Sequence, residues 1–373
     1  MTAGGERLSS DDSPVMAAEL RFANRFPHEA VFPPKTASVP MIEGIQYLRA
    51  IAALMIVAHH ARHFFGGTLP GWSEFGASGV DIFFVISGFV IAPASRRFDP
   101  QAARAPQISD FLARRAIRVI PLYWLALALA AQYLVRKTDL GLLLDFAFLP
   151  RHHPTQKAFI APALMPGWTI NYEIFFYVLF AMSMAFGALR YRVLGACMGA
   201  LVLAGWALPS ESIFWRVYTS PLLLEFLIGV GIQFSYERGI VLPRWMSVCL
   251  LVTGFIGLAQ ASVWSGFSAA AVVLGAIHAC RGWSVPSLRL IGDASYSIYL
   301  SHLFSFVPIG RLCRAIGFAT PDAMSIGAVI ALHVLLATIA GIAVHFVIER
   351  PLIPLSRHLW DRLGKLVAPP VPS

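Results

Sequence analysis

Apolar runs long enough to cross a membrane recur from residue 45 to residue 348, with short polar segments between them. From this pattern we predict ten membrane-spanning helices, whose ends extend into the flanks where a run falls short of the roughly 20 residues of a straight span. The predicted spans cover residues 45–63, 77–95, 119–135, 168–188, 193–209, 217–235, 246–261, 264–280, 291–311 and 325–348. The predicted fold class is therefore all-α and polytopic, because a helix satisfies its own backbone polar groups in lipid.

The same pattern divides the chain into a membrane part and two tails. Residues 1–40 hold Ser, Asp, Pro and charged residues without an apolar run, so we expect a disordered tail there. Residues 41–352 form the predicted membrane domain, and residues 353–373 form a second, short tail.

Composition supports a membrane protein. Of the 373 residues, 57% are hydrophobic and only 13% are charged, whereas soluble domains have about 25% charged residues. The formal charge of +9 could suggest a nucleic-acid partner, but we interpret it as Lys and Arg gathered on one membrane face. We therefore expect no nucleic-acid partner. Four cysteines, Cys197, Cys249, Cys280 and Cys313, have no metal-binding spacing, so we interpret them as packing residues and expect no metal.

The distribution of basic residues predicts the orientation in the membrane. An even number of spans places both termini on one side. Of the 29 Lys and Arg residues, 21 fall on that side and 8 on the other. The positive-inside rule then places both termini and both tails in the cytoplasm.

The first span, GIQYLRAIAALMIVAHHARH, is apolar enough to enter a membrane yet carries Arg49, His59 and His60. Arg49 and His60 are eleven residues apart, about three helical turns or roughly 16 Å, so they face nearly the same way. His59 is rotated by about 100° from His60. Ionisable residues inside a membrane indicate a functional site, although Arg49 could also extend to a lipid headgroup and the histidines could lie at the far interface.

Other polar residues interrupt the apolar spans. Asp81 opens the second span, Glu173 lies a turn into the fourth, and Glu225 lies in the sixth. Tyr299 and His302 belong to a polar stripe on the ninth. Each has a purely structural alternative, such as a helix cap, a hydrated interface or a local bond within the core.

Arg115 and Arg118 precede the third span, are three residues apart and share a helix face. We predict a short helix there, with Pro121 in the first turn of the next span, and we expect Pro351 to end the last span. The pair could anchor the chain at the membrane surface or bind phosphate, whose oxygens match the guanidinium fork. On the other face, the loop Lys137–Gly167 could cover a site or contact an acceptor. Ser87-Gly88, inside the second span, indicates close helix packing.

Seven stretches in order resemble the acyltransferase-3 family of integral membrane O-acyltransferases, and more narrowly the bacterial exopolysaccharide O-acetyltransferases. They are LRAIAALMIVAHH, GVDIFFVISGFVI, the Arg115/Arg118 pair, PGWTINYEIFFYVLF, PLLLEFLIGV, GDASYSIYLSH and ERP, between about residues 44 and 351. The resemblance implies that Arg49 and His60 are central to transfer. It also implies an acyl-CoA donor, usually acetyl-CoA, and a carbohydrate hydroxyl as acceptor, with no permanently bound cofactor.

The leading hypothesis is an O-acetyltransferase of the bacterial inner membrane. His60 would act as general base on the acceptor hydroxyl, and Glu173 or Asp81 would orient it or position the sugar. Arg49, Arg115 and Arg118 would bind the phosphates of the donor or guide it inward. Tyr299, His302 and Glu225 would support the site. Direct transfer and an acyl-His intermediate both stay open.

The expected partners are acyl-CoA, a carbohydrate that could be lipid-linked, the lipid bilayer and polysaccharide assembly machinery. A transporter or flippase for a lipid-linked sugar is the alternative function, because it could use the same buried charges to pass a substrate. A third hypothesis, an assembly subunit, explains the hydrophobicity but not the aligned Arg49 and His60.

Overall fold

The computed structural model describes residues 42–65, 72–94, 99, 102–136, 139–260, 265–315 and 323–367. The predicted tail 1–40 lies outside these residues. Within them, regular secondary structure is helical, and the β-type pairing consists of an isolated bridge between His152 and Ile160. The all-α prediction is therefore confirmed for the described part.

The first half of the chain forms α2 (Glu43–Phe65), α3 (Trp72–Ala77), α4 (Gly79–Ala94), α5 (Arg104–Leu129), the π-helix η1 (Ala130–Val135), α6 (Gly141–Phe146), α7 (Gly167–Met184), η2 (Gly187–Leu189) and α8 (Arg190–Ala207). The second half forms α9 (Ile213–Tyr218), α10 (Leu223–Glu237), α11 (Arg244–Ala259), α12 (Ser265–Ala279), α13 (Pro286–Asp293), α14 (Ser295–Ser301), η3 (His302–Ser305), α15 (Phe306–Ala315), α16 (Ala323–Val344), the π-helix η4 (His345–Glu349) and α17 (Arg350–Val367).

By length and composition, helices able to cross a membrane are present. In the described part there are five of them: Phe75–Pro93, Arg104–Val135, Gly187–Ala207, Ile213–Glu237 and Ile326–Arg362. The shorter helices α11 and α12 are also apolar. α2 and α7 fall outside this set, because their polar and charged side chains lower their hydropathy. The chain is thus a membrane protein, while the count of ten spans stays a prediction.

Two predicted helix boundaries at prolines are wrong. α5 begins at Arg104 and runs through Pro121 without interruption, so Arg115 and Arg118 belong to the same long helix as the third apolar run. Likewise, the helix does not end at Pro351: η4 leads directly into α17. Helices in membranes tolerate proline because neighbouring helices and local π-turns satisfy the freed carbonyl groups. At Pro351 the π-turn of η4 directly precedes the proline, which gives the backbone such a local adjustment.

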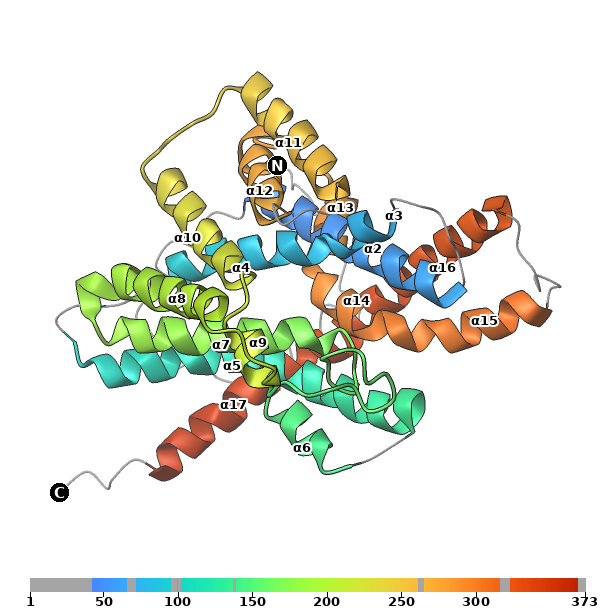
Figure 1. The fold of residues 1–373 in the computed structure, drawn as a ribbon, viewed down its shortest axis with the longest axis horizontal. Coiled ribbons are helices and arrows are strands. Elements are labelled where there is room, and N and C mark those ends of the chain that lie inside the picture. The colour runs from blue at the N-terminus through green and yellow to red at the C-terminus, as the bar shows by residue number, and fades with distance from the viewer. Residues whose placement is uncertain are drawn as a thin grey trace, which may run out of the picture. The chain divides into compact units, whose positions relative to one another are not determined.

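α2 and α4 lie side by side, and each packs against several other helices (Figure 1). α2 contacts α13, α14 and α16, and α4 packs tightly against α10. A Cβ atom on Gly88 would lie 2.0 Å from the carbonyl oxygen of Phe226, and one on Gly229 would lie 2.0 Å from that of Val85. The prediction that Ser87-Gly88 allows close helix packing is therefore confirmed.

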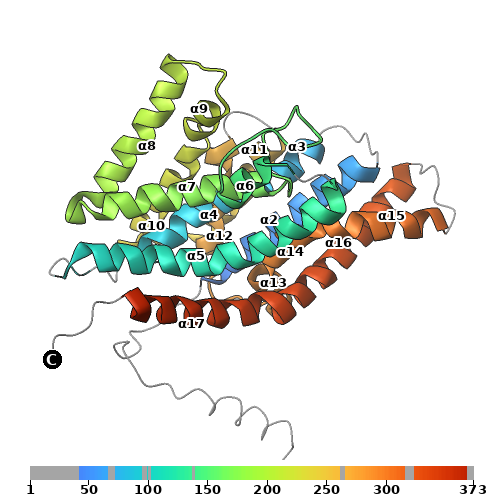
Figure 2. The ribbon, with the colours of Figure 1, turned by 90° about the horizontal axis from the view of Figure 1, so that it is seen from below.

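An aromatic core joins these helices to α5 and α7. Phe226 of α10 stacks on Phe84 of α4 with ring centroids 4.7 Å apart, and on Phe176 of α7 at 4.4 Å. Phe111 of α5 packs against Phe180 of α7 at 5.3 Å. α17 runs along α5 on the other side (Figure 2). This packing holds α2, α4, α5 and α7 around the cavity described next.

Candidate functional site

A cavity of about 390 Å³ lies between α2, α4, α5, α7 and α14. Its lining includes five of the nine predicted site residues: Arg49, Arg115, Arg118, Glu173 and Tyr299. Apolar and aromatic side chains make up much of the remaining wall, as is usual for ligand sites with a few convergent polar groups. The structure therefore brings together residues that lie up to 250 positions apart in the sequence.

Three guanidinium groups face this cavity. Arg49 donates a hydrogen bond to Gln46 Oε1 at 3.3 Å and lies within electrostatic range of Arg118. Arg115 lies over the ring of Tyr177, 5.6 Å from its centroid. By contrast, Arg114 forms an ion pair with Asp110 and does not line the cavity. Like charges that converge on one space favour an anionic ligand, and guanidinium groups match phosphate oxygens in particular.

Glu173 provides the acidic side of the same cavity. Its Oε1 accepts hydrogen bonds from Tyr177 on the same helix and from Ser87 of α4, the latter at 3.3 Å. The carboxylate is thus fixed between α4 and α7 by two hydroxyl donors. It remains part of the cavity lining, where a substrate can reach it.

His60 pairs with His302, and neither histidine is part of the cavity lining. His302 Nδ1 lies 2.7 Å from the carbonyl oxygen of Tyr299, so this nitrogen carries the proton, and Nε2 is an acceptor in the neutral ring. His60 Nδ1 lies 3.0 Å from the carbonyl oxygen of Ile56 and 3.2 Å from His302 Nε2. His60 Nδ1 therefore donates, which leaves His60 Nε2 as the unprotonated nitrogen.

The structure gives the orienting contact on His60 to His302, not to Glu173 or Asp81. Asp81 instead accepts a hydrogen bond from Ser265 of α12 at 2.8 Å and lies close to Glu225. Glu225 is buried, and its Oε2 has no hydrogen-bond partner in the described part. Asp81 and Glu225 thus form a separate group, because Asp81 turns toward α10 and α12 rather than toward the cavity.

Tyr299 links the cavity to the histidine pair. Its hydroxyl lies 2.8 Å from the carbonyl oxygen of Pro166 and 2.8 Å from Thr169 Oγ1, and its ring lines the cavity. Its own carbonyl oxygen accepts the hydrogen bond from His302. The predicted polar stripe of the ninth span therefore has two roles, with Tyr299 at the cavity wall and His302 against His60.

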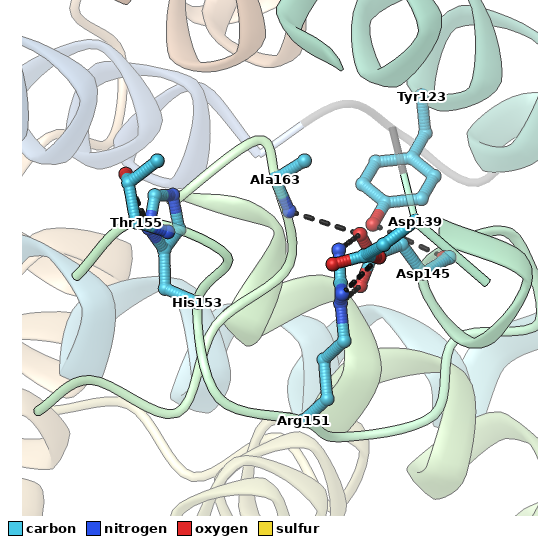
Figure 3. Close-up of polar contacts among 7 residues, drawn as sticks. All are labelled: Tyr123, Asp139, Asp145, Arg151, His153, Thr155 and Ala163. Carbon is cyan, nitrogen blue, oxygen red and sulfur yellow. Dashed lines mark hydrogen bonds and ion pairs between the residues drawn. The ribbon is translucent and has the colours of Figure 1, made fainter. Parts of the chain in front are cut away.

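The loop that precedes α7 is folded around a buried ion pair (Figure 3). Arg151 donates from Nε to Asp145 Oδ1 and from Nη2 to Asp145 Oδ2, both at 2.8 Å. The amide of Ala163 donates to the same carboxylate at 3.0 Å, and Arg151 Nη1 contacts Asp139 at 2.7 Å. Asp145 is fully buried, whereas Asp139 is exposed. Sequence reasoning missed this pair, because Asp145 lies near the end of α6 and Arg151 lies in the irregular segment after it, so no regular spacing links them.

The two carboxylates that contact Arg151 have pKa values shifted in opposite directions. Burial raises the pKa of Asp145, and the hydrogen bonds and charge of Arg151 offset only part of this rise. For Asp139, desolvation acts in the same direction, yet the hydrogen bond and charge of Arg151 lower its pKa. Asp145 therefore depends on its surrounding donors to remain ionised, and Asp139 does not.

Comparisons with known proteins identify the family of this chain. A model of the acyltransferase domain matches residues 42–350. Exopolysaccharide production protein ExoZ of Rhizobium meliloti (strain 1021) is 34% identical over 304 residues, covering 76% of this chain and 91% of that protein. Acyltransferase MdmB of Streptomyces mycarofaciens is 23% identical, with 87% and 94% covered. The O-acetyl transferase of Shigella phage Sf6 is 24% identical, with 68% and 81% covered.

No solved structure was found to match the chain. The domain match, however, spans the whole set of helices from α2 to η4 and includes every residue of the cavity. The chain belongs to the acyltransferase-3 family of membrane O-acyltransferases.

Proposed function

We propose that this enzyme transfers an acyl group, preferably acetyl, from acyl-CoA to a hydroxyl of an extracytoplasmic or lipid-linked carbohydrate such as an exopolysaccharide unit. One observation carries the proposal: a cavity lined by three arginines also includes Tyr299, whose carbonyl oxygen accepts the hydrogen bond from His302 of the His60–His302 pair. The names of the similar proteins, an exopolysaccharide production protein and an O-acetyl transferase, support a polysaccharide acceptor and an acetyl donor.

The proposed orientation places the cavity entrance on the cytoplasmic side of a bacterial inner membrane. It rests on ten spans with both termini in the cytoplasm, which the distribution of Lys and Arg favours. Arg49, Arg115 and Arg118 then face the compartment that supplies acyl-CoA. His60, about three turns further along α2, lies toward the opposite side, from which the carbohydrate would approach.

In this proposal the arginines bind the phosphates of the donor. Each charge-assisted hydrogen bond contributes about 1.5–3 kcal/mol, and a guanidinium fork engages two oxygens at once. The apolar and aromatic wall formed by Phe83, Phe84 and Tyr296 suits the acyl end of the thioester. Glu173, which lines the same wall, would position a polar group of either substrate.

The chemical step requires a base for the acceptor hydroxyl. His60 Nε2, free of a proton in the tautomer assigned above, would remove the hydroxyl proton as the oxygen attacks the thioester carbonyl. The C–S bond then breaks, and the CoA thiolate takes up the proton that His60 Nε2 removed, which returns the histidine to its neutral form. Two-step transfer through an acyl group on His60 uses the same nitrogen, so both routes agree with this geometry.

A transporter or flippase of a lipid-linked sugar would use buried charges to pass a substrate through the membrane. Family membership favours acyl transfer over this alternative. The two functions differ in what is lost when His60 is changed: acylation for the enzyme, export for the transporter.

The proposal is tested by the acyl content of the host's polysaccharides. A strain that lacks the gene should still export polysaccharide, but the acetate released from it by mild base should fall. Complementation with the wild-type gene should restore the acetate, and complementation with the His60→Ala variant should not. Unchanged acetate together with lost export would overturn the proposal in favour of a transporter.

A further inference from the structure

A second cavity, of about 180 Å³, lies on the opposite face of α7 from the first. Thr169, Ile170 and Glu173 line the first cavity, whereas Trp168, Asn171 and Tyr172 line the second. This division follows from the helix, in which neighbouring residues are rotated by about 100°. The N-terminal part of α7 therefore forms a wall common to two separate spaces.

Asn171 is the central polar group of this second cavity. Its side chain is 3% exposed, and its Oδ1 makes no hydrogen bond to any part of the chain that the structure describes. A buried carbonyl oxygen without a donor is unfavourable, so such an atom at a cavity wall indicates a ligand that brings a hydroxyl or an amine.

The remaining lining narrows the chemistry of that ligand. Trp168 and Tyr172 lie with their ring centroids 5.9 Å apart and present aromatic surface. Arg216 of α9 adds a guanidinium that is exposed and forms no ion pair with the described residues. Aromatic faces pack against the C–H faces of a sugar ring, while an amide and a guanidinium bind its hydroxyl oxygens and protons.

We propose that this second cavity is a subsite for one sugar ring of the carbohydrate acceptor, away from the ring that is acylated. The inference rests on the proposed function and adds to it a location for acceptor recognition. Contacts to a sugar ring remote from the reacting hydroxyl hold the acceptor in position. Binding energy from this remote ring then helps to place the hydroxyl against the thioester.

The wall opposite α7 is held in place by the loop in Figure 3. Pro150 and Ile160 line the cavity from this loop. Pro150 precedes Arg151 of the buried ion pair, and Ile160 itself forms the isolated bridge with His152. A rigid wall costs less conformational entropy on binding than a flexible one, which favours a built subsite over an accidental gap.

The proposal is tested with the full-length enzyme in lipid nanodiscs, which expose both faces. The acceptor probe is a set of oligosaccharides released from the polysaccharide of a strain that lacks this gene, and the donor is labelled acetyl-CoA. Asn171→Leu should raise the acceptor KM about tenfold (about 1.4 kcal/mol) and leave the acetyl-CoA KM within about twofold. Arg216→Gln, at an exposed position that tolerates change, should raise the acceptor KM about threefold.

Gln233→Leu is the matched control. Gln233 is likewise a buried amide with an unpartnered oxygen, but it lies on α10 outside both cavities, so its acceptor KM should stay unchanged. If Asn171→Leu fails size-exclusion chromatography as a folded protein, Arg216→Gln decides alone. Wild-type enzyme that transfers no label contradicts the proposed function. Wild-type enzyme that transfers label, with unchanged acceptor KM in the folded variants, overturns the subsite and assigns the cavity to water or lipid headgroups.

Discussion

His60 Nδ1 and His302 Nε2 lie 3.2 Å apart although 242 positions separate the two residues in the chain. The contact joins α2 to the start of η3. Each histidine also contacts a backbone carbonyl oxygen of the preceding helical turn, Ile56 in α2 for His60 and Tyr299 in α14 for His302. The Nδ1 proton of His302 points to the Tyr299 carbonyl oxygen, and that of His60 points to both the Ile56 carbonyl oxygen and His302 Nε2, so both rings have defined tautomers. The nitrogen left free is His60 Nε2, the atom that a general base requires.

We expect His60→Ala to leave the protein folded and inserted while acyl transfer falls by about 100- to 10,000-fold, the usual contribution of a general base. His59→Ala should have a much smaller effect, because His59 is rotated by about 100° from the face that meets His302. The measurement is acetate on polysaccharide, with protein level in the membrane as control. A more severe loss in His59→Ala than in His60→Ala would show that the base is assigned to the wrong residue.

His302 acts through His60, so its variants should change turnover more than binding. In His302→Gln the side-chain oxygen can still accept the proton of His60 Nδ1, and we expect a kcat loss of roughly tenfold. His302→Leu removes the acceptor and should cost roughly 100-fold, with KM values for both substrates within about twofold. Equal losses in Gln and Leu variants, or a rise in KM alone, would contradict a positioning role.

The sequence allowed the local part of this site to be predicted. The spacing of Arg49 and His60, and of Arg115 and Arg118, depends only on helical geometry, and the structure keeps each pair on a continuous helix. The partner of His60 could not be predicted in this way. His302 stood out as part of a polar stripe, but which helix that stripe faces depends on the packing of α14 against α2.

Other features depend on tertiary structure altogether. The orphan oxygen of Asn171 is visible only once its neighbours are placed, since an asparagine in sequence gives no sign of lacking a partner. The continuation of α5 through Pro121 was missed for a different reason. Proline rules derived from soluble helices overstate its breaking effect where lipid and neighbouring helices leave the backbone no better alternative.

The buried ion pair of the loop should be worth far more than the exposed one on the same arginine. Asp145→Asn leaves Arg151 without its buried counter-charge, and we expect the free energy of opening of residues 139–163 to fall by about 3–5 kcal/mol. Asp139→Asn removes an exposed, screened partner and should cost less than about 1 kcal/mol. Hydrogen exchange over residues 139–163 measures both. Similar exchange in the two variants would contradict the difference that burial predicts.

Both termini should lie in the cytoplasm, as the 21 to 8 distribution of Lys and Arg predicts. A reporter that is active only in the cytoplasm should therefore be active when it is fused at Ser373. Conversely, a cysteine introduced at Phe159, which is 55% exposed on the loop before α7, should react with an impermeant maleimide added outside. Labelling of Phe159→Cys only after the membrane is broken would reverse the orientation and with it the proposed side of donor entry.

The donor assignment rests on Arg115 and Arg118. Replacing both with Ala should raise the acyl-CoA KM by more than about tenfold, because two charge-assisted contacts of about 1.5–3 kcal/mol each are lost. Acceptor KM should change little, since the cavity that these arginines line is separated by α7 from the proposed acceptor subsite.

Lysine replacements separate phosphate binding from simple membrane anchoring. Lysine keeps the charge but loses the planar fork, and its stacking over the Tyr177 ring at position 115 would differ, so binding should be restored only in part. An anchoring role predicts instead that Lys restores function fully and that the Ala variant inserts wrongly. Arg114→Ala is the matched control, because Arg114 sits on the same helix, pairs with Asp110 and does not line the cavity. A correctly inserted double-Ala protein with unchanged acetyl-CoA dependence would leave these arginines as anchors and would place the donor phosphates elsewhere.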